Sequence, residues 1–305
     1  MTAKLTMGPI LFHWDTDKKR DFYYKIADET AIDTVYIGEV ICSKRAPFFE
    51  KHYPDIIERL HGGGKKVVIS TLSEVMIKHD RKMVDSACQM DDIEIEANDA
   101  SALYHLVGRK HRIGQLLNVY SEDTLRFLAS KGATHICLTT ELPADSLAVL
   151  GKAANDLGIH LECQIFGRMS LALSARCYHA RAHGKIKDNC QFVCGEDDDG
   201  LDLKTLDGKN FLSINGIQTL SYTYLNLLHE MESLQDMGIE YFRISPHSFD
   251  IVKTTKIIQD TLNKKITPKE GVVRLKNLGI DAPFSNGFFY KKSGFAWTHD
   301  VSKMA

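Results

Sequence analysis

The chain has 305 residues, of which 44% are hydrophobic and 26% are charged, and 38 basic residues almost balance 40 acidic ones, leaving a formal net charge of −2. This composition is typical of a globular protein, and the small net charge gives no sign of nucleic acid or an anionic membrane as a partner. No apolar run approaches the roughly 18 residues of a transmembrane helix, and the first residues lack a signal-peptide apolar core. We therefore expect a cytoplasmic protein whose seven cysteines are reduced rather than joined in disulfides.

Short apolar or β-branched runs alternate with amphipathic stretches along most of the chain. We expect strands at 8–14, 34–38, 66–70, 93–97, 115–119, 135–139, 161–166 and 241–245. We expect helices at 17–29, 48–60, 74–89, 100–107, 144–157, 219–237 and 251–262, and one more that Ser121 opens as its N-cap residue. A further strand is expected at 211–214, after a region without clear periodicity.

Eight strands that alternate with helices over about 250 residues match the (β/α)8 barrel, or TIM-like barrel, in both count and length. The alternative is an open doubly wound sheet, but the first strand–helix turn has no G-x-G-x-x-G motif and the chain has no phosphate-binding P-loop motif. We predict an α/β protein with a single barrel domain over residues 1–305. A long insertion at about 167–210 follows strand seven, and an extension at about 265–305 follows the barrel.

The insertion carries three cysteines, Cys177, Cys190 and Cys194, with the spacing C-x12-C-x3-C in a polar, basic segment. Such a segment has little apolar surface of its own to bury, and a metal centre bound by thiolates would hold it in place. The fourth ligand that we expect is Cys42, in the loop after the second predicted strand. Because the loops that follow barrel strands open on one face, the four thiols can meet there.

The spacing alone leaves the kind of centre open. Structural zinc sites usually have two short C-x2–4-C pairs, and here only Cys190 and Cys194 are that close. Iron–sulfur clusters accept irregular spacing, so the pattern favours a cluster over zinc, with a metal-free cysteine group as the third possibility. The other cysteines, Cys88, Cys137 and Cys163, end or lie within apolar elements and read as small hydrophobic residues.

Other polar residues stand near these loops. Lys44 and Arg45 neighbour Cys42, and such basic residues would offset the charge of a cluster, bind an anionic substrate, or form a solvated face. His179 and His183, at i and i+4, could bind a metal if helical, but without an H-E-x-x-H motif and beside a stronger thiol set we expect supporting or surface roles. Polar side chains also follow predicted strands, where they would face an active site or cap helices: Glu39, Asn98, Asp99, Asn118 and Glu141.

Four segments resemble a family: GEVICSKR at 38–45, SARCYHAR at 174–181, KDNC at 187–190 and LSINGIQTLS at 212–221. Between Gly8 and Phe289 the chain resembles the collagenase-like family of unassigned peptidases, and among them members that act in oxygen-independent ubiquinone biosynthesis. The resemblance implies a 4Fe-4S cluster bound by Cys42, Cys177, Cys190 and Cys194. It also implies a subunit of a hydroxylase complex acting on the ring of a quinone precursor, as a heterodimer with a related protein, UbiU, and together with the lipid-carrier-like protein UbiT.

Two other functions stay open at this point. A metal-dependent, peptidase-like hydrolase would need a metal-bound water and a general base, for which the candidates are Glu39, Glu141 and His179. A non-catalytic subunit would supply structure and electron relay while its partner carries out the chemistry. The sequence shows no G-x-S-x-G motif and identifies no substrate-binding residue.

Overall fold

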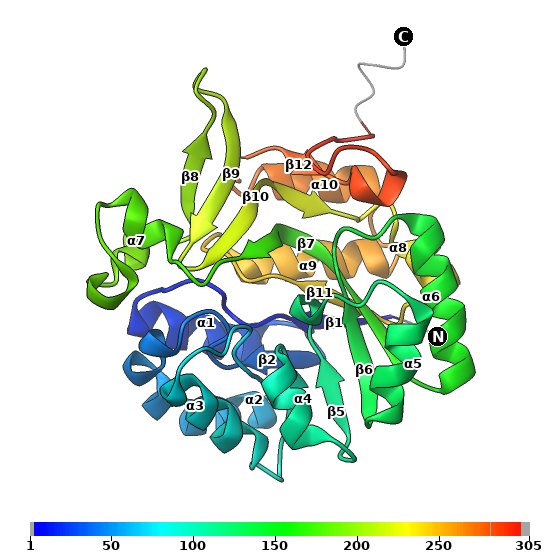
Figure 1. Ribbon diagram of the computed structural model, residues 1–305. Coiled ribbons are helices and arrows are strands. Elements are labelled where there is room, and N and C mark those ends of the chain that lie inside the picture. The colour runs from blue at the N-terminus through cyan, green and yellow to red at the C-terminus, as the bar shows by residue number, and fades with distance from the viewer. Residues whose placement is uncertain (1–2, 281, 300–305) are drawn as a thin grey trace.

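Eight parallel strands close into a barrel in the computed structural model, which describes residues 3–280 and 282–299 (Figure 1). Each strand pairs with the next along the chain, and β11 pairs with both β7 and β1, which closes the ring. The predicted TIM-like (β/α)8 barrel is thus confirmed. The barrel strands are β1 (Lys4–Met7), β2 (Thr34–Ile37), β3 (Lys66–Ser70), β4 (Glu94–Ala97), β5 (His111–Ile113), β6 (Ala133–Leu138), β7 (His160–Leu173) and β11 (Tyr241–Ile244).

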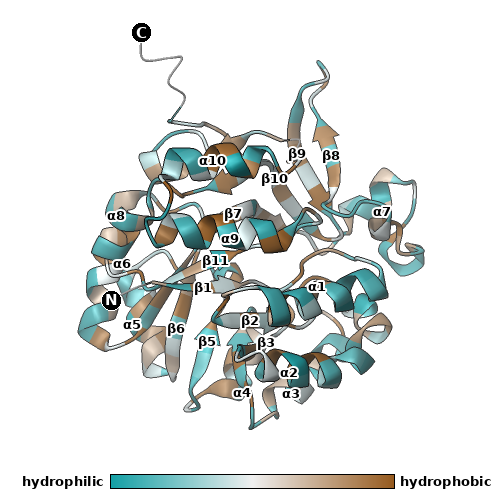
Figure 2. Ribbon diagram, turned by 180° about the vertical axis from the view of Figure 1, so that it is seen from behind, coloured by the Kyte–Doolittle hydropathy of each residue, from teal (hydrophilic) through white to brown (hydrophobic). Residues whose placement is uncertain are grey.

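Amphipathic helices surround the barrel and turn their apolar sides toward the strands (Figure 2). Local sequence sets their ends: the Asp15 side chain accepts hydrogen bonds from the first turn of α1, and Ser121 caps α5 as predicted. Gly158 ends α6 with φ +67°, a conformation that favours glycine. These helices are α1 (Thr16–Glu29), α2 (Tyr53–Gly62), α3 (Lys78–Cys88), α4 (Ala100–Leu106), α5 (Glu122–Ser130), α6 (Ala144–Leu157), α8 (Met231–Asp236) and α9 (Ile251–Leu262).

A charged hydrogen-bond network occupies the inside of the barrel. The buried Glu162 carboxylate accepts hydrogen bonds from Tyr36 Oη (2.6 Å), His135 Nε2 (2.8 Å) and Arg243 Nε and Nη2 (3.0 and 2.9 Å). Arg243 also donates to Glu96 (2.6 Å). Burial opposes ionisation of Glu162, but Arg243 and His135 together hold its pKa well below the usual range. The interior is therefore held by ion pairs as well as by apolar contacts.

Strand β7 continues beyond the barrel and starts a second, antiparallel sheet. Its second half pairs with β10 (Gln218–Asn226), which pairs with β9 (Asn210–Asn215), which in turn pairs with β8 (Leu201–Lys204). Figure 1 shows this sheet standing off one end of the barrel, with the segment around α7 (Tyr178–Ala182) beside its base. The cysteine-bearing insertion connects β7 to β8, so it begins and ends on the same small sheet.

The rest of the insertion contains two short 3₁₀ helices, η4 (Lys187–Asn189) and η5 (Val193–Gly195). After the barrel, α10 (Pro268–Lys276), β12 (Phe284–Ser285) and η6 (Phe288–Tyr290) follow, and β12 pairs with β10. In the part of the chain that the structure describes, no helix has both the length and the apolarity needed to cross a bilayer.

Three predicted elements were wrong. The first strand is Lys4–Met7, and residues 8–14 form the loop after it, whose apolar side chains are buried by tertiary contacts rather than by a sheet. The fifth strand is His111–Ile113, and most of the predicted 115–119 strand is a 3₁₀ turn, η3 (Gln115–Leu117). The predicted helix at 219–237 is strand β10 followed by the short helix α8, since pairing with β7 and β9 overrides local preference.

Candidate metal centre

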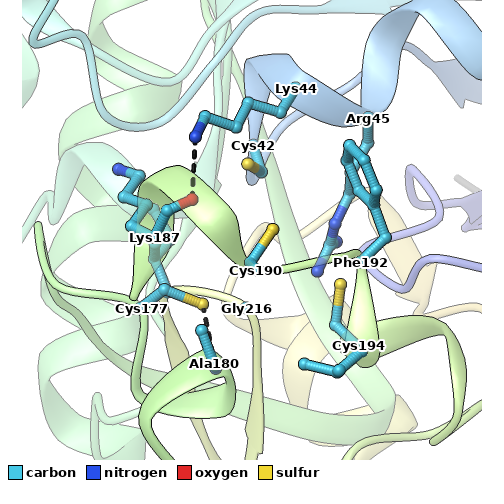
Figure 3. Close-up of a pocket in the computed structure, with 12 residues that line it drawn as sticks. Cys42, Lys44, Arg45, Cys177, Ala180, Lys187, Cys190, Phe192, Cys194 and Gly216 are labelled. Carbon is cyan, nitrogen blue, oxygen red and sulfur yellow. Dashed lines mark hydrogen bonds between the residues drawn. The ribbon is translucent and has the colours of Figure 1, made fainter. Parts of the chain in front are cut away.

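The four cysteines chosen from the sequence line one cavity at the carboxyl-terminal end of the barrel strands (Figure 3). Cys42 immediately precedes η1 (Ser43–Phe48) in the loop after β2, and Cys177 precedes α7. Cys190 follows η4, and Cys194 lies within η5. In Figure 3 the four sulfur atoms surround a common space. The barrel thus brings together thiols that are far apart in the sequence.

The loop that carries Cys42 is shaped by the side chain of Glu39. One carboxylate oxygen of Glu39 accepts hydrogen bonds from the backbone N–H groups of Ile41 and Cys42, both at 3.0 Å. Gly38 begins the loop with φ +133°, and a Cβ atom there would lie 2.3 Å from the carbonyl oxygen of Ser70. Glu39, one of the candidate general bases, is buried and holds this loop in place.

Unusual backbone conformations present the other thiols. Gln191 and Phe192, between Cys190 and Cys194, both adopt the left-handed conformation, with φ of +50° and +54°. For residues with a side chain this conformation costs about 1–2 kcal/mol each. The ring of Phe192 packs against Phe48, with centroids 4.7 Å apart, and holds the turn. Strain of this kind in a cysteine turn is typical of a functional site.

Two further contacts join the segments around the cavity. Lys44 Nζ donates to the carbonyl oxygen of Lys187 at 2.7 Å, which ties the loop after β2 to the insertion (Figure 3). The turn between β9 and β10 supplies Gly216, which lines the cavity with φ +62°. A Cβ atom at Gly216 would lie 2.6 Å from Nη2 of Arg45, so only glycine lets this turn approach the guanidinium so closely.

Arg45 places a buried positive charge beside the thiols. Its side chain donates to neutral acceptors, the carbonyl oxygen of Leu11 (3.1 Å) and Oδ1 of Asn215 (2.8 Å). Within residues 3–280 and 282–299 its Nε finds no hydrogen-bond partner. Burial alone would lower the pKa of Arg45, but nearby anionic groups, with Cys194 the strongest, raise it. Glu39 supplies one buried carboxylate near this guanidinium, and thiolates at Cys194 and Cys42 would add further compensating charge.

Burial and the neighbouring charge also shift the pKa values of the thiols, each in the direction opposite to its effect on Arg45. Burial raises the pKa of Cys42 and of Cys194, while the charge of Arg45 counteracts the rise in both. A thiol in such surroundings keeps its proton until a metal displaces it, since coordination deprotonates the sulfur.

The four thiols form a donor set that two kinds of metal centre use. Four thiolates at 2.3 Å from a tetrahedral zinc ion would lie about 3.8 Å apart. A cubane cluster takes its thiolates from farther apart, and four cysteines around one cavity are a donor set that could hold either kind of centre.

The remaining sequence candidates lie outside the lining of this cavity. Asp99 caps α4 by accepting from the N–H of Ser101, and Glu141 accepts from Tyr120 Oη (2.7 Å). Asn98 is buried and donates to the carbonyl oxygen of Thr71, while Asn118 ends η3 in the left-handed conformation. Cys88, Cys137 and Cys163 are buried in the barrel walls and helices, as small hydrophobic residues would be.

Two features were missed by the sequence reasoning. The charged network around Glu162 carries no motif, because its members come from separate strands. The contact of His179 with Asp197 was also missed, although an acidic turn after the last cysteine was visible in the sequence.

The comparisons with known proteins give a family and distant structural likenesses. The profile described as peptidase family U32 matches residues 22–298. Among solved structures, an uncharacterised Bacillus cereus protein is 11% identical with a TM-score of 0.39, covering 80% of this chain and 61% of its own. Phospho-2-dehydro-3-deoxyheptonate aldolase from Thermotoga maritima is 10% identical with a TM-score of 0.39, covering 93% of this chain and 72% of its own. The chain spans about three fifths of the Bacillus protein. On the profile match, the chain belongs to peptidase family U32.

Proposed function

We propose that this protein is the 4Fe-4S subunit of an oxygen-independent hydroxylase complex that acts on the ring of a quinone precursor during ubiquinone biosynthesis. The observation that carries the proposal is the set of four thiols from two distant segments around one cavity, beside the buried charge of Arg45. The second support is the resemblance of four sequence segments to UbiV, a ubiquinone-biosynthesis member of the collagenase-like family. The proposal also puts the protein in the cytoplasm.

The residues around the cavity have separate tasks in this proposal. Cys42, Cys177, Cys190 and Cys194 would hold the cluster, which supplies electron transfer when bound. Arg45 would offset part of its negative charge, and Phe192, which lines the cavity, would limit access of water to one side. Lys44 would keep the two cysteine-bearing segments together through its bond to Lys187.

The proposed partners follow from the same resemblance. We propose a heterodimer with a UbiU-like protein and cooperation with the lipid-carrier-like protein UbiT. The peptidase-like alternative has no comparable observation behind it. Of its candidate bases, Glu39 is engaged by backbone N–H groups, and His179 is paired with Asp197.

Anaerobic purification followed by iron and sulfide analysis tests the cluster. We expect about four irons per chain and a brown protein. Cys190→Ala should lose most of the iron, whereas Cys88→Ala, a buried cysteine outside the cavity, should keep it. A colourless, iron-free preparation of the unaltered protein would overturn the proposal.

Co-expression with the UbiU-like partner tests the role of the cluster. If Cys190→Ala still forms the heterodimer but no longer supports anaerobic quinone hydroxylation, the cluster serves the reaction. If hydroxylation continues at the wild-type rate in the iron-depleted variant, the chain is a scaffold and the redox role is refuted.

A further inference from the structure

A second group of metal-ligating side chains lies next to the cysteine cavity and is not among its lining residues. It consists of His179, His183 and Asp197, whose ligand atoms all lie within 4.8 Å of one another. The histidines are one helical turn apart at α7, and their rings stack with an interplanar angle of 6° and centroids 5.3 Å apart. Asp197 comes from the turn after η5, and its Oδ2 lies 2.9 Å from Nε2 of His179.

The tautomer of His183 suits metal binding. Nδ1 of His183 lies 3.0 Å from the carbonyl oxygen of His179. Because a carbonyl oxygen only accepts, Nδ1 carries the proton and Nε2 keeps a free lone pair. Metal-bound histidines commonly have such a second bond to a backbone carbonyl, which fixes the ring. Nε2 also lies 4.0 Å from a carboxylate oxygen of Glu196.

The carboxylates of the acidic turn at residues 196–200 contact different partners. Asp198 pairs with Lys18 on α1 at 2.6 Å, and Asp199 accepts hydrogen bonds from the backbone and hydroxyl of Ser248. Asp197 is thus the aspartate of this turn that faces α7. One carboxylate and two imidazoles form a donor set that suits Zn²⁺ or Fe²⁺.

The three side chains differ in their exposure to solvent. The side chain of His179 is fully buried, whereas those of Asp197 and His183 are 25% and 28% exposed. Three protein ligands with one solvent-facing side would leave coordination positions for water. A cation of Mg²⁺ type is disfavoured here, since such ions prefer oxygen donors over imidazole.

We infer that His179, His183 and Asp197 form a second metal site for a divalent first-row transition ion of the Zn²⁺ or Fe²⁺ class. The bound ion fastens α7 to the turn after η5. Cys177 lies two residues before His179, and Cys194 lies three residues before Asp197. The ion therefore braces the two ends of the cysteine-bearing segment without touching the cysteine cavity.

Zinc titration of the full chain, purified anaerobically and freed of loosely bound ions, tests this site. We expect calorimetry to show one Zn²⁺ bound per chain in addition to any iron. His183→Ala and Asp197→Asn should each weaken zinc binding at least tenfold. Asp198→Asn is the matched control, because that neighbouring aspartate pairs with Lys18, and it should bind zinc like the unaltered chain.

X-ray absorption at the zinc edge separates this site from the thiols. Nitrogen and oxygen ligands, with imidazole scattering, support the inference, whereas sulfur ligands place the zinc at the cysteines and overturn it. It is also overturned if the unaltered chain binds no zinc, or if both variants bind it undiminished. Iron content measured on the same samples reports on the cysteine site independently, so either site can fail alone.

Discussion

Arg243 is the cation that holds the inside of the barrel together, and its loss tests that role. Arg243→Met keeps much of the volume but removes three hydrogen bonds, two to Glu162 and one to Glu96. Both carboxylates stay buried, at 0% and 1% side-chain exposure. Removing one partner of a buried ion pair costs about 3–5 kcal/mol because the remaining charge loses its compensation. With a urea m-value of about 3 kcal/mol/M, the unfolding midpoint should fall by about 1 M or more.

Urea unfolding followed by circular dichroism and fluorescence measures this loss. Arg59→Met is the matched control, since Arg59 pairs with Asp28 at 2.6 Å on the surface, and it should leave the midpoint unchanged. The stabilising role of Arg243 is refuted if Arg243→Met shifts the urea midpoint no more than Arg59→Met does.

The pH dependence of the same loss gives a second check. In the native protein the pKa of Glu162 lies well below its unfolded value, so its stabilising contribution is present above about pH 4.3 and disappears as the pH falls through the folded pKa. Without Arg243 that cation no longer offsets burial, so the pKa of Glu162 in the folded variant rises above its unfolded value. Because the two unfolded chains titrate alike, the difference in unfolding free energy between the two proteins should shrink as the pH falls through the pKa of Glu162 in the folded variant, which lies above that in the native protein. A difference that is constant from pH 7 to pH 4 would contradict this.

Three further perturbations address the packing and the cysteine site. Arg45→Met should make the reduction potential of the proposed cluster more negative, because the guanidinium stabilises the reduced form, which carries one more negative charge. An unchanged potential in a redox titration followed by EPR would contradict this. Gly151→Ala should cost about 1–3 kcal/mol by overpacking, since a Cβ there would lie 1.7 Å from a backbone oxygen. The control is Gly62→Ala, at a helical position with open space around it, which should be neutral or stabilising. Equal effects of Gly151→Ala and Gly62→Ala on the urea midpoint would refute overpacking at Gly151. Trp14→Phe removes the hydrogen bond from Nε1 to the carbonyl oxygen of Asp198 (2.7 Å) and should lower the free energy of unfolding in urea by about 1 kcal/mol. An unchanged free energy of unfolding would mean that this hydrogen bond is not stabilising.

The barrel could be predicted because most of its strands and helices carry their own periodicity. The 66–70 run is apolar and β-branched, and it forms β3 with those same bounds. The first and fifth strands could not be found in this way. β5 has only three residues, beginning with His111 and Arg112. Both polar side chains are buried: His111 contacts the carbonyl oxygen of Arg109 just before the strand, and Arg112 donates to Glu94 on β4. By contrast, residues 8–14 look like a strand because the loop they form is buried.

The meeting of the cysteines was predictable from topology, but the details around them were not. Placing Cys42 after β2 and the other three after β7 was enough to put them at one end of the barrel. The contribution of the β9–β10 turn to the cavity lining was not predicted. The local sequence indicated a helix over residues that form strand β10 (Gln218–Asn226). Asp197 likewise reaches His179 only through the fold of the insertion.

The closure of the barrel has a consequence for the order of events during maturation. The loop that holds Cys42 is brought to the other three thiols by the pairing of consecutive strands from β2 to β7. Contacts between such distant segments form late, since loop-closure entropy must be overcome first. A zinc finger folds around its metal, whereas here a finished barrel would receive one. If the proposed cluster is present, iron starvation should accordingly leave a folded protein without it, which can take up the cluster when the iron supply returns.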